Sequence, residues 1–202
     1  MILKEIQEIK RKKGLQIAED EAYSWFKKAK KNPMDPTVVF CENQLMQVGK
    51  LNQFSYNPKL KDTLDYYDKR PLVLSLGVIH RKKRRYELGL NLNFIPAPYK
   101  WFILDKIQST YSGFFLRQRD GRSPNNALKQ PQIMYRYQVV KALLAQHGFE
   151  FAIRTYIPSR KSRVYCINYN NWVDAAFLSI EKFEGITYNE MIQEFRKSRL
   201  SR

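Results

Sequence analysis

The stretch from Tyr66 to Pro96, YYDKRPLVLSLGVIHRKKRRYELGLNLNFIP, decides how this chain folds. Pro71 to Ile79 is a continuous apolar run, typical of a buried strand. Tyr86 to Phe94 alternates apolar and polar residues, as a strand with one buried face does. Between the two runs lie five consecutive basic residues: Arg81, Lys82, Lys83, Arg84 and Arg85. The stretch therefore predicts an antiparallel β-hairpin that carries its densest positive charge at an exposed tip.

The segments around this hairpin predict an α+β fold. We expect a small curved antiparallel sheet or partial barrel over about residues 48–95, plus a strand near residues 163–169, packed with helices. Residues 96–113 predict a helix that ends at Gly113, and residues 132–148 predict one that ends at Gly148. Thr187 and Glu190 have the spacing of a capping box, which predicts a helix near the C-terminal end.

Residues 1–34 predict an N-terminal amphipathic helical arm, and residues 35–202 a single α+β domain. Gly14 interrupts the helical pattern, and KNPMDP at residues 31–36 ends it because proline cannot continue a helix. The apolar stripes of the arm are candidates for binding a partner: Ile2, Ile6, Ile9, Trp25 and Phe26. Packing of the second stripe against the chain's own domain is the alternative.

The composition points to an anionic partner. The chain has 202 residues, with 36 Lys and Arg against 19 Asp and Glu, a net charge of +17. Such an excess must face water or a polyanion, and nucleic acid is the usual one. Besides the hairpin tip, two polar loops contribute candidate phosphate contacts: Arg117, Arg119, Arg122, Arg160, Lys161 and Arg163. For each of these segments, solvated charge without a partner is the alternative.

Several classes of protein and site find no support. No apolar stretch approaches the roughly 20 residues that span a bilayer, and the first residues lack the apolar core of a signal peptide, so we expect a soluble, unsecreted protein. Cys41 and Cys166 lie far apart in the sequence, which indicates neither a zinc site nor a disulfide framework.

Catalysis finds equally little support. The sequence has no P-loop and no Gly-x-Ser-x-Gly motif. His80 and His147 have no metal-ligand spacing, and Asp62, Asp65 and Asp68 lie in a turn-rich segment that packing explains. We therefore predict a protein that is not an enzyme and that uses neither a cofactor nor a metal.

Several motifs together resemble a known family. They are Gly-Lys-Leu at 49–51, Tyr-x-Pro-Lys at 56–59, Tyr-Tyr-Asp-x-x-Pro-Leu-Val at 66–73, Gly-Leu-Asn at 89–91 with Pro96, and Trp172. Their pattern over residues 49–96 and 172–185 is similar to that of the DNA end-protector, or head-completion, family of T-even-type tailed phages. The basic tip and the N-terminal arm depart from the family's usual pattern.

The resemblance and the charge together imply a bacteriophage virion protein, assembled in the host cytoplasm. It would bind double-stranded DNA non-specifically through the phosphate backbone, protect the end of the packaged genome and complete the head or neck. The alternative is an architectural component of the neck, tail or baseplate, whose basic surfaces contact portal, neck or tail proteins. Homo-oligomerisation is open, and no membrane partner is expected.

Overall fold

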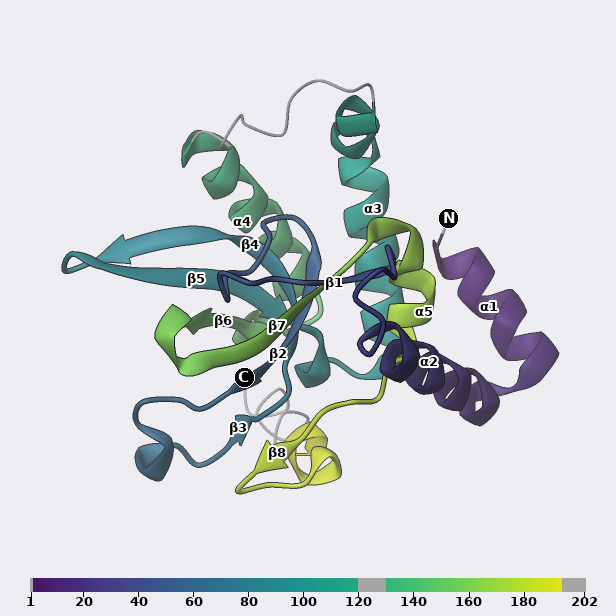
Figure 1. Cartoon of the computed structure of the whole chain (residues 1–202), viewed down its shortest axis with the longest axis horizontal. Coiled ribbons are helices and arrows are strands. Elements are labelled where there is room, and N and C mark those ends of the chain that lie inside the picture. Colours follow the sequence, from purple (N-terminus) through teal and green to yellow (C-terminus); the bar gives the residue numbers. More distant parts are fainter. Residues whose placement is uncertain (1, 120–129, 194–202) are drawn as a thin grey trace.

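The computed structural model describes residues 2–119 and 130–193, with side chains over 2–109 and 137–193 (Figure 1). It is an α+β structure, as predicted. The labelled α-helices are α1 (Ile2–Lys13), α2 (Leu15–Ala29), α3 (Ala97–Arg119), α4 (Gln130–Ala145) and α5 (Trp172–Ala176), and a further helix covers residues 188–193. The strands are β1 (Val38–Phe40), β2 (Leu51–Tyr56), β3 (Tyr67–Asp68), β4 (Leu72–Arg81), β5 (Arg84–Asn91), β6 (Ile153–Tyr156), β7 (Lys161–Ile167) and β8 (Phe183–Glu184). Short 3₁₀ turns include η1 (Lys61–Thr63) and η2 (Leu92–Phe94).

A six-stranded sheet organises the fold. Its strand order is β1-β7-β2-β4-β5-β6, and every neighbouring pair is antiparallel. The sheet is open, so of the two predicted forms the curved sheet is present and the barrel is not closed. β7 lies two residues earlier than the strand predicted near 163–169. β1 and β6 form the two edges and were not predicted as strands. β3 pairs separately with β8.

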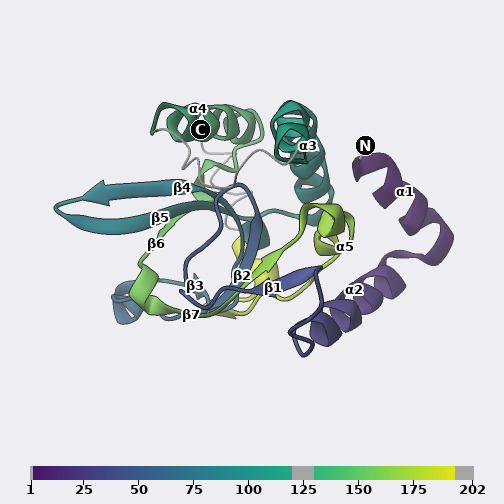
Figure 2. The same cartoon turned by 45° about the horizontal axis from the view of Figure 1, so that its top comes forward.

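The sheet has an apolar core on each face. Helices α3 and α4 lie over one face (Figure 2), where Leu74 and Leu90 pack with Leu104 and Val140 in the larger core. The other face carries a smaller core under the segment between β1 and β2, whose members are Cys41, Met46, Phe54, Val73, Tyr156, Val164 and Cys166. The predicted alternation therefore holds up to Asn91, where β5 ends and η2 begins, but the second face of the strand is also covered. This is why Glu87 and Asn91 are buried rather than solvated.

The two N-terminal helices pack on the chain's own core. Ile2 and Ile6 of α1 are 2% and 0% exposed, and Phe26 of α2 is 4% exposed. Ile9 and Trp25 are partly buried against the same core. This corrects the prediction that these five residues form a free partner-binding stripe: α1 packs against α3, α5 and α2, and the apolar side chains of both helices belong to the larger core. The division into an arm and a domain stays a prediction.

Most helical boundaries follow the sequence signals, but α4 ends at Ala145, three residues before the predicted end at Gly148. α2 ends at Ala29, before KNPMDP, and Gly14 with φ 81° separates α1 from α2. α3 does not stop at Gly113 but continues to Arg119, because a single glycine costs only about 1 kcal/mol within a helix. The predicted capping box forms: Thr187 and Glu190 exchange hydrogen bonds at the start of a helix over 188–193. Among the described residues, no helix is long and apolar enough to cross a membrane.

Candidate nucleic-acid interface

The basic hairpin has the geometry that its sequence predicts. β4 and β5 pair antiparallel up to Arg81 opposite Arg84. Lys82 and Lys83 form a two-residue turn with φ 47° and 62°, and positive φ at both positions is the mark of a type I′ turn. This turn matches the twist of the flanking strands, so the hairpin stays paired to its end. Figure 1 shows it reaching beyond the rest of the sheet, at one end of the long axis.

The tip concentrates unpaired positive charge. All five basic residues, Arg81–Arg85, are exposed, and His80 beside them is exposed too. Within residues 2–119 and 130–193, no carboxylate forms an ion pair with any of them. Like charges on facing positions of a strand pair repel one another. The tip is therefore a surface on which a bound polyanion would relieve repulsion rather than displace an existing partner.

The second predicted basic loop divides into exposed and buried residues. Arg160 and Arg163 are exposed, and Arg163 has the unusual φ of 54°. Lys161 is not a surface cation, which corrects its place among the phosphate contacts. Its side chain is fully buried, forms an ion pair with Glu87 and lies 5.2 Å from the centre of the Phe54 ring. Burial lowers the pKa of Lys161, and the Glu87 carboxylate opposes that shift.

The Lys161–Glu87 pair is a structural crosslink of the smaller core. Glu87 comes from β5 and Lys161 begins β7, and Glu87 also accepts a 2.9 Å hydrogen bond from the backbone N–H of Met46. A buried charge needs a partner, since an unpaired ion in the interior is strongly destabilising. Lys161 therefore fixes the segment between β1 and β2 instead of facing a ligand.

The remaining predicted contacts are less completely placed. Arg117 and Arg119 belong to the last turn of α3, where the structure describes the backbone but not the side chains. Arg122 lies outside the described residues. Their role in DNA binding stays a prediction.

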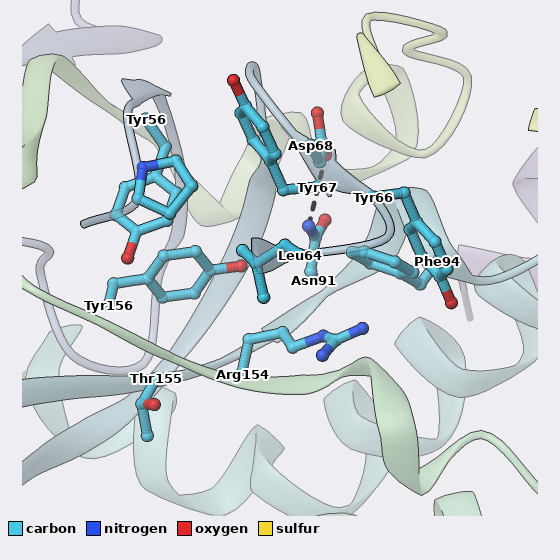
Figure 3. A pocket seen from close by; sticks show the side chains of 11 residues that line it. Tyr56, Leu64, Tyr66, Tyr67, Asp68, Asn91, Phe94, Arg154, Thr155 and Tyr156 are labelled. Atoms are coloured by element: carbon cyan, nitrogen blue, oxygen red, sulfur yellow. Dashed lines mark hydrogen bonds between the residues drawn. The ribbon is translucent and has the colours of Figure 1, made fainter. Parts of the chain in front are cut away.

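A pocket of about 220 Å³ opens beside β6 and the loop that leads into β3 (Figure 3). Tyr56 and Tyr156 stand on one side of it, and Tyr66 and Phe94 stand on the other. Its other lining residues are Pro58, Leu64, Tyr67, Asp68, Asn91, Arg154 and Thr155. The rings are held by their own contacts: Tyr56 and Tyr156 meet edge to face at 5.1 Å between centroids. The pocket therefore has aromatic walls, and contacts between the rings hold these side chains in place.

Asp68 anchors the floor of this pocket. Its Oδ1 accepts hydrogen bonds from the backbone N–H of Arg70 at 2.9 Å and of Lys182 at 3.2 Å. Its Oδ2 accepts from the side-chain amides of Asn91 at 3.2 Å and Asn93 at 2.7 Å. Burial raises the pKa of Asp68, and these four donors oppose the rise. Asp68 therefore caps the turn before Pro71, and the side chains of Asn91 and Asn93 bind this loop through its carboxylate.

Arg154 is the cation of the pocket, and sequence reasoning missed it. Its guanidinium lies 4.7 Å from the centre of the Phe94 ring. Its Nε is buried and has no hydrogen-bond partner among the described residues. Arg154 and Tyr156 alternate along β6, but a four-residue edge strand gives too short a pattern to be recognised. No signal in the sequence indicates that these two residues lie next to Tyr56 and Phe94.

The described residues include no cluster of metal ligands and no disulfide. There, no three His, Cys, Asp or Glu side chains are grouped as a metal site would require. Cys41 and Cys166 are free and buried, yet both contact Gln47: its amide donates to Cys41 Sγ at 3.7 Å, and Cys166 Sγ donates to its carbonyl at 3.3 Å. The two thiols thus lie together in the smaller core although they are far apart in the sequence.

The comparison with protein families decides the family. The model of the family described as phage T4 terminal DNA protecting protein matches residues 3–194. The chain belongs to this family. The match extends well beyond the motifs at residues 49–96 and 172–185 that suggested it, and it includes the N-terminal helices and the basic tip. No curated protein and no solved structure matches the chain. The terminal DNA protecting family is described by a protective role toward DNA, not by a reaction.

Proposed function

We propose that this protein binds the ends of double-stranded DNA in the phage particle and shields them from exonucleases, without sequence preference and without catalysis. The family description supports DNA protection as the role. The protection is steric, because a chain seated on the end denies a nuclease its starting point. Completion of the head or neck, with portal, neck or tail proteins as neighbours, belongs to the same proposal.

The observation that carries the proposal is the exposed, unpaired cationic tip at the end of a projecting hairpin. Phosphate contacts position a protein on DNA and carry no sequence information. Lysine and arginine side chains at the end of a narrow, fully paired hairpin suit that task. Few amides or free aromatic side chains accompany them, so base-specific contacts in a groove have no support at the tip.

Salt dependence of binding tests this proposal. The logarithm of the affinity for duplex DNA should fall linearly with the logarithm of the salt concentration, by about 0.9 per phosphate contacted. Replacing Lys82→Asn and Lys83→Gly introduces the residues that a type I′ turn prefers, and Arg84→Ser with Arg85→Ser removes two more charges. The four changes should weaken binding and reduce the slope by up to about 3.6.

A control with the same loss of charge separates contact from net charge. Arg11, Lys12, Lys27 and Lys28 are exposed on α1 and α2, at the opposite end of the long axis (Figure 1). Their combined replacement by glutamine removes four charges far from the tip, beyond a Debye length of about 8 Å at physiological salt. We expect nearly unchanged binding from this control. Equal losses in both variants would refute the tip as the DNA contact.

A second function, an architectural contact with another virion protein, is favoured by the apolar surface at β1. Exposed apolar side chains gather at the edge strand β1 and before it: Val39 and Phe40 are each 45% exposed, and Met34 is 87% exposed. Such side chains suit contact with another virion protein. If the tip variant binds DNA normally but fails to enter particles, the basic hairpin also contacts a virion protein rather than DNA.

A further inference from the structure

The pocket beside β6 combines two chemical features that suit a ligand. Its walls are aromatic rings fixed by mutual contacts, and its cation, Arg154, keeps a buried Nε without a hydrogen-bond partner among the described residues. The acidic group of the pocket, Asp68, is already occupied by four donors. The pocket therefore offers aromatic faces on which a planar ring can stack and a cation, Arg154, that can bind an anion.

The size and position of the pocket limit the class of ligand that it can bind. At about 220 Å³ it is smaller than the roughly 300–1,000 Å³ of pockets for drug-sized molecules, so it suits one ring system and not a folded peptide segment. β6 pairs directly with β5, with Tyr156 opposite Glu87, so the pocket lies beside the root of the basic hairpin. In Figures 1 and 2 the hairpin tip and the loop around η1 lie toward the same end of the long axis.

We propose that this pocket holds the terminal nucleotide of a DNA strand, with its base against the tyrosine and phenylalanine rings and its phosphate at Arg154. The inference rests on the proposed function, because a chain that binds duplex ends presents its pocket to the last base pair. Aromatic stacking accepts any base, since every base has a π face. Unpairing costs least where a base is already frayed or single-stranded. The pocket thus distinguishes an end from internal duplex.

The first test uses the wild-type protein and the fluorescent base 2-aminopurine, whose emission depends on stacking. One duplex carries it at the terminal position and another carries it at an internal position. Adding the protein should change the emission of the terminal probe and leave the internal probe unchanged. Placing the probe at the 3′ terminus of one strand or at the 5′ terminus of the other shows which terminus enters the pocket. Equal responses at both positions would overturn the proposal.

The second test uses variants at the rim of the pocket. Tyr67→Ala removes a half-buried ring, and Arg154→Met removes the cation while keeping the apolar stem. Each should weaken binding to a linear duplex about tenfold, within the range that one stacked base contributes. Neither should change binding to a duplex whose ends are closed by covalent loops. Tyr23→Ala and Arg11→Met, at exposed positions of α2 and α1, are matched controls that should bind both DNAs as the wild type does.

The two levels of the proposal fail differently. If the wild type binds neither linear nor closed duplex, the DNA-binding function fails and the pocket assignment fails with it. If the wild type prefers linear DNA but both rim variants keep that preference, end binding stands and the pocket assignment is wrong. If the rim variants lose incorporation into particles while end binding is unchanged, the pocket holds an aromatic side chain of a virion protein instead.

Discussion

Replacing Asp68 with asparagine should destabilise the protein far more than its conservative size suggests. Both oxygens of Asp68 act as acceptors, and each receives two hydrogen bonds. An asparagine oxygen can keep two of these bonds, but its NH₂ group then faces the other two donors. Each buried donor left without a partner costs about 1–3 kcal/mol. Removal of a buried charge offsets part of this cost, so we expect the free energy of unfolding to fall by about 2–4 kcal/mol.

Rotating a neighbouring amide does not rescue the asparagine variant. Asn91 uses its own carbonyl oxygen to accept a 3.1 Å hydrogen bond from the backbone N–H of Asn93. A flip of the Asn91 amide would therefore exchange one lost bond for another. The Asn93 amide likewise donates to the backbone carbonyl of Arg70 at 3.1 Å. The four-donor arrangement is specific for a carboxylate.

Urea unfolding followed by tryptophan fluorescence measures the effect. The transition midpoint should fall in Asp68→Asn while the m-value stays unchanged. Asp62→Asn is the control, because Asp62 is exposed in η1 and its change should alter stability by less than about 0.5 kcal/mol. A loss of less than about 1 kcal/mol in Asp68→Asn would refute the account of Asp68 as the acceptor that fixes the pocket floor.

Three further changes test other parts of the structure. Glu87→Gln should lower the free energy of unfolding by about 3–5 kcal/mol, because it leaves the Lys161 ammonium buried without its counter-ion. In the same urea assay, the double variant with Lys161→Met added should recover much of that loss. Lys82→Asn with Lys83→Gly should raise the thermal stability by about 1 kcal/mol, since asparagine and glycine adopt positive φ more readily, while duplex affinity falls; unchanged stability would contradict the type I′ turn. Hydrogen bonds from Thr187, the cap residue of helix 188–193, lower the pKa of Glu190. The stabilising contribution of Glu190 is therefore present above the ordinary carboxyl pKa and is lost as the pH falls through the lowered value. Hydrogen exchange of helix 188–193 should differ between wild type and Glu190→Gln at neutral pH and converge in acid.

The parts of the fold that follow from local patterns could be predicted. The continuous apolar run before Arg81 and the alternation after Arg85 specify a hairpin, and five like charges between them can only face outward. Proline at 33 and 36 ends the N-terminal helices, and Thr187 with Glu190 begins the last one. In each case, a physical requirement of a few neighbouring residues determines the outcome.

The parts that depend on distant packing could not be predicted. Lys161 belongs to a basic segment by sequence, but the strand direction of β7 carries its side chain into the smaller core, where Glu87 meets it. Ile2 and Ile6 have the spacing of a docking stripe, yet only the position of α3 shows that the chain itself covers them. Arg154 joins the pocket because β6 pairs with β5, which no local pattern announces.

Protection of linear DNA against an exonuclease that begins at duplex ends tests the central claim most directly. Two linear duplexes, one short and one much longer, are titrated with the protein at equal concentration of ends, and the surviving full-length DNA is measured. End binding predicts that both duplexes are protected at the same ratio of protein to ends, and that the four-charge tip variant protects poorly while the control variant on α1 and α2 protects normally. Protection that requires protein in proportion to DNA length, or no protection at saturating protein, would contradict the account.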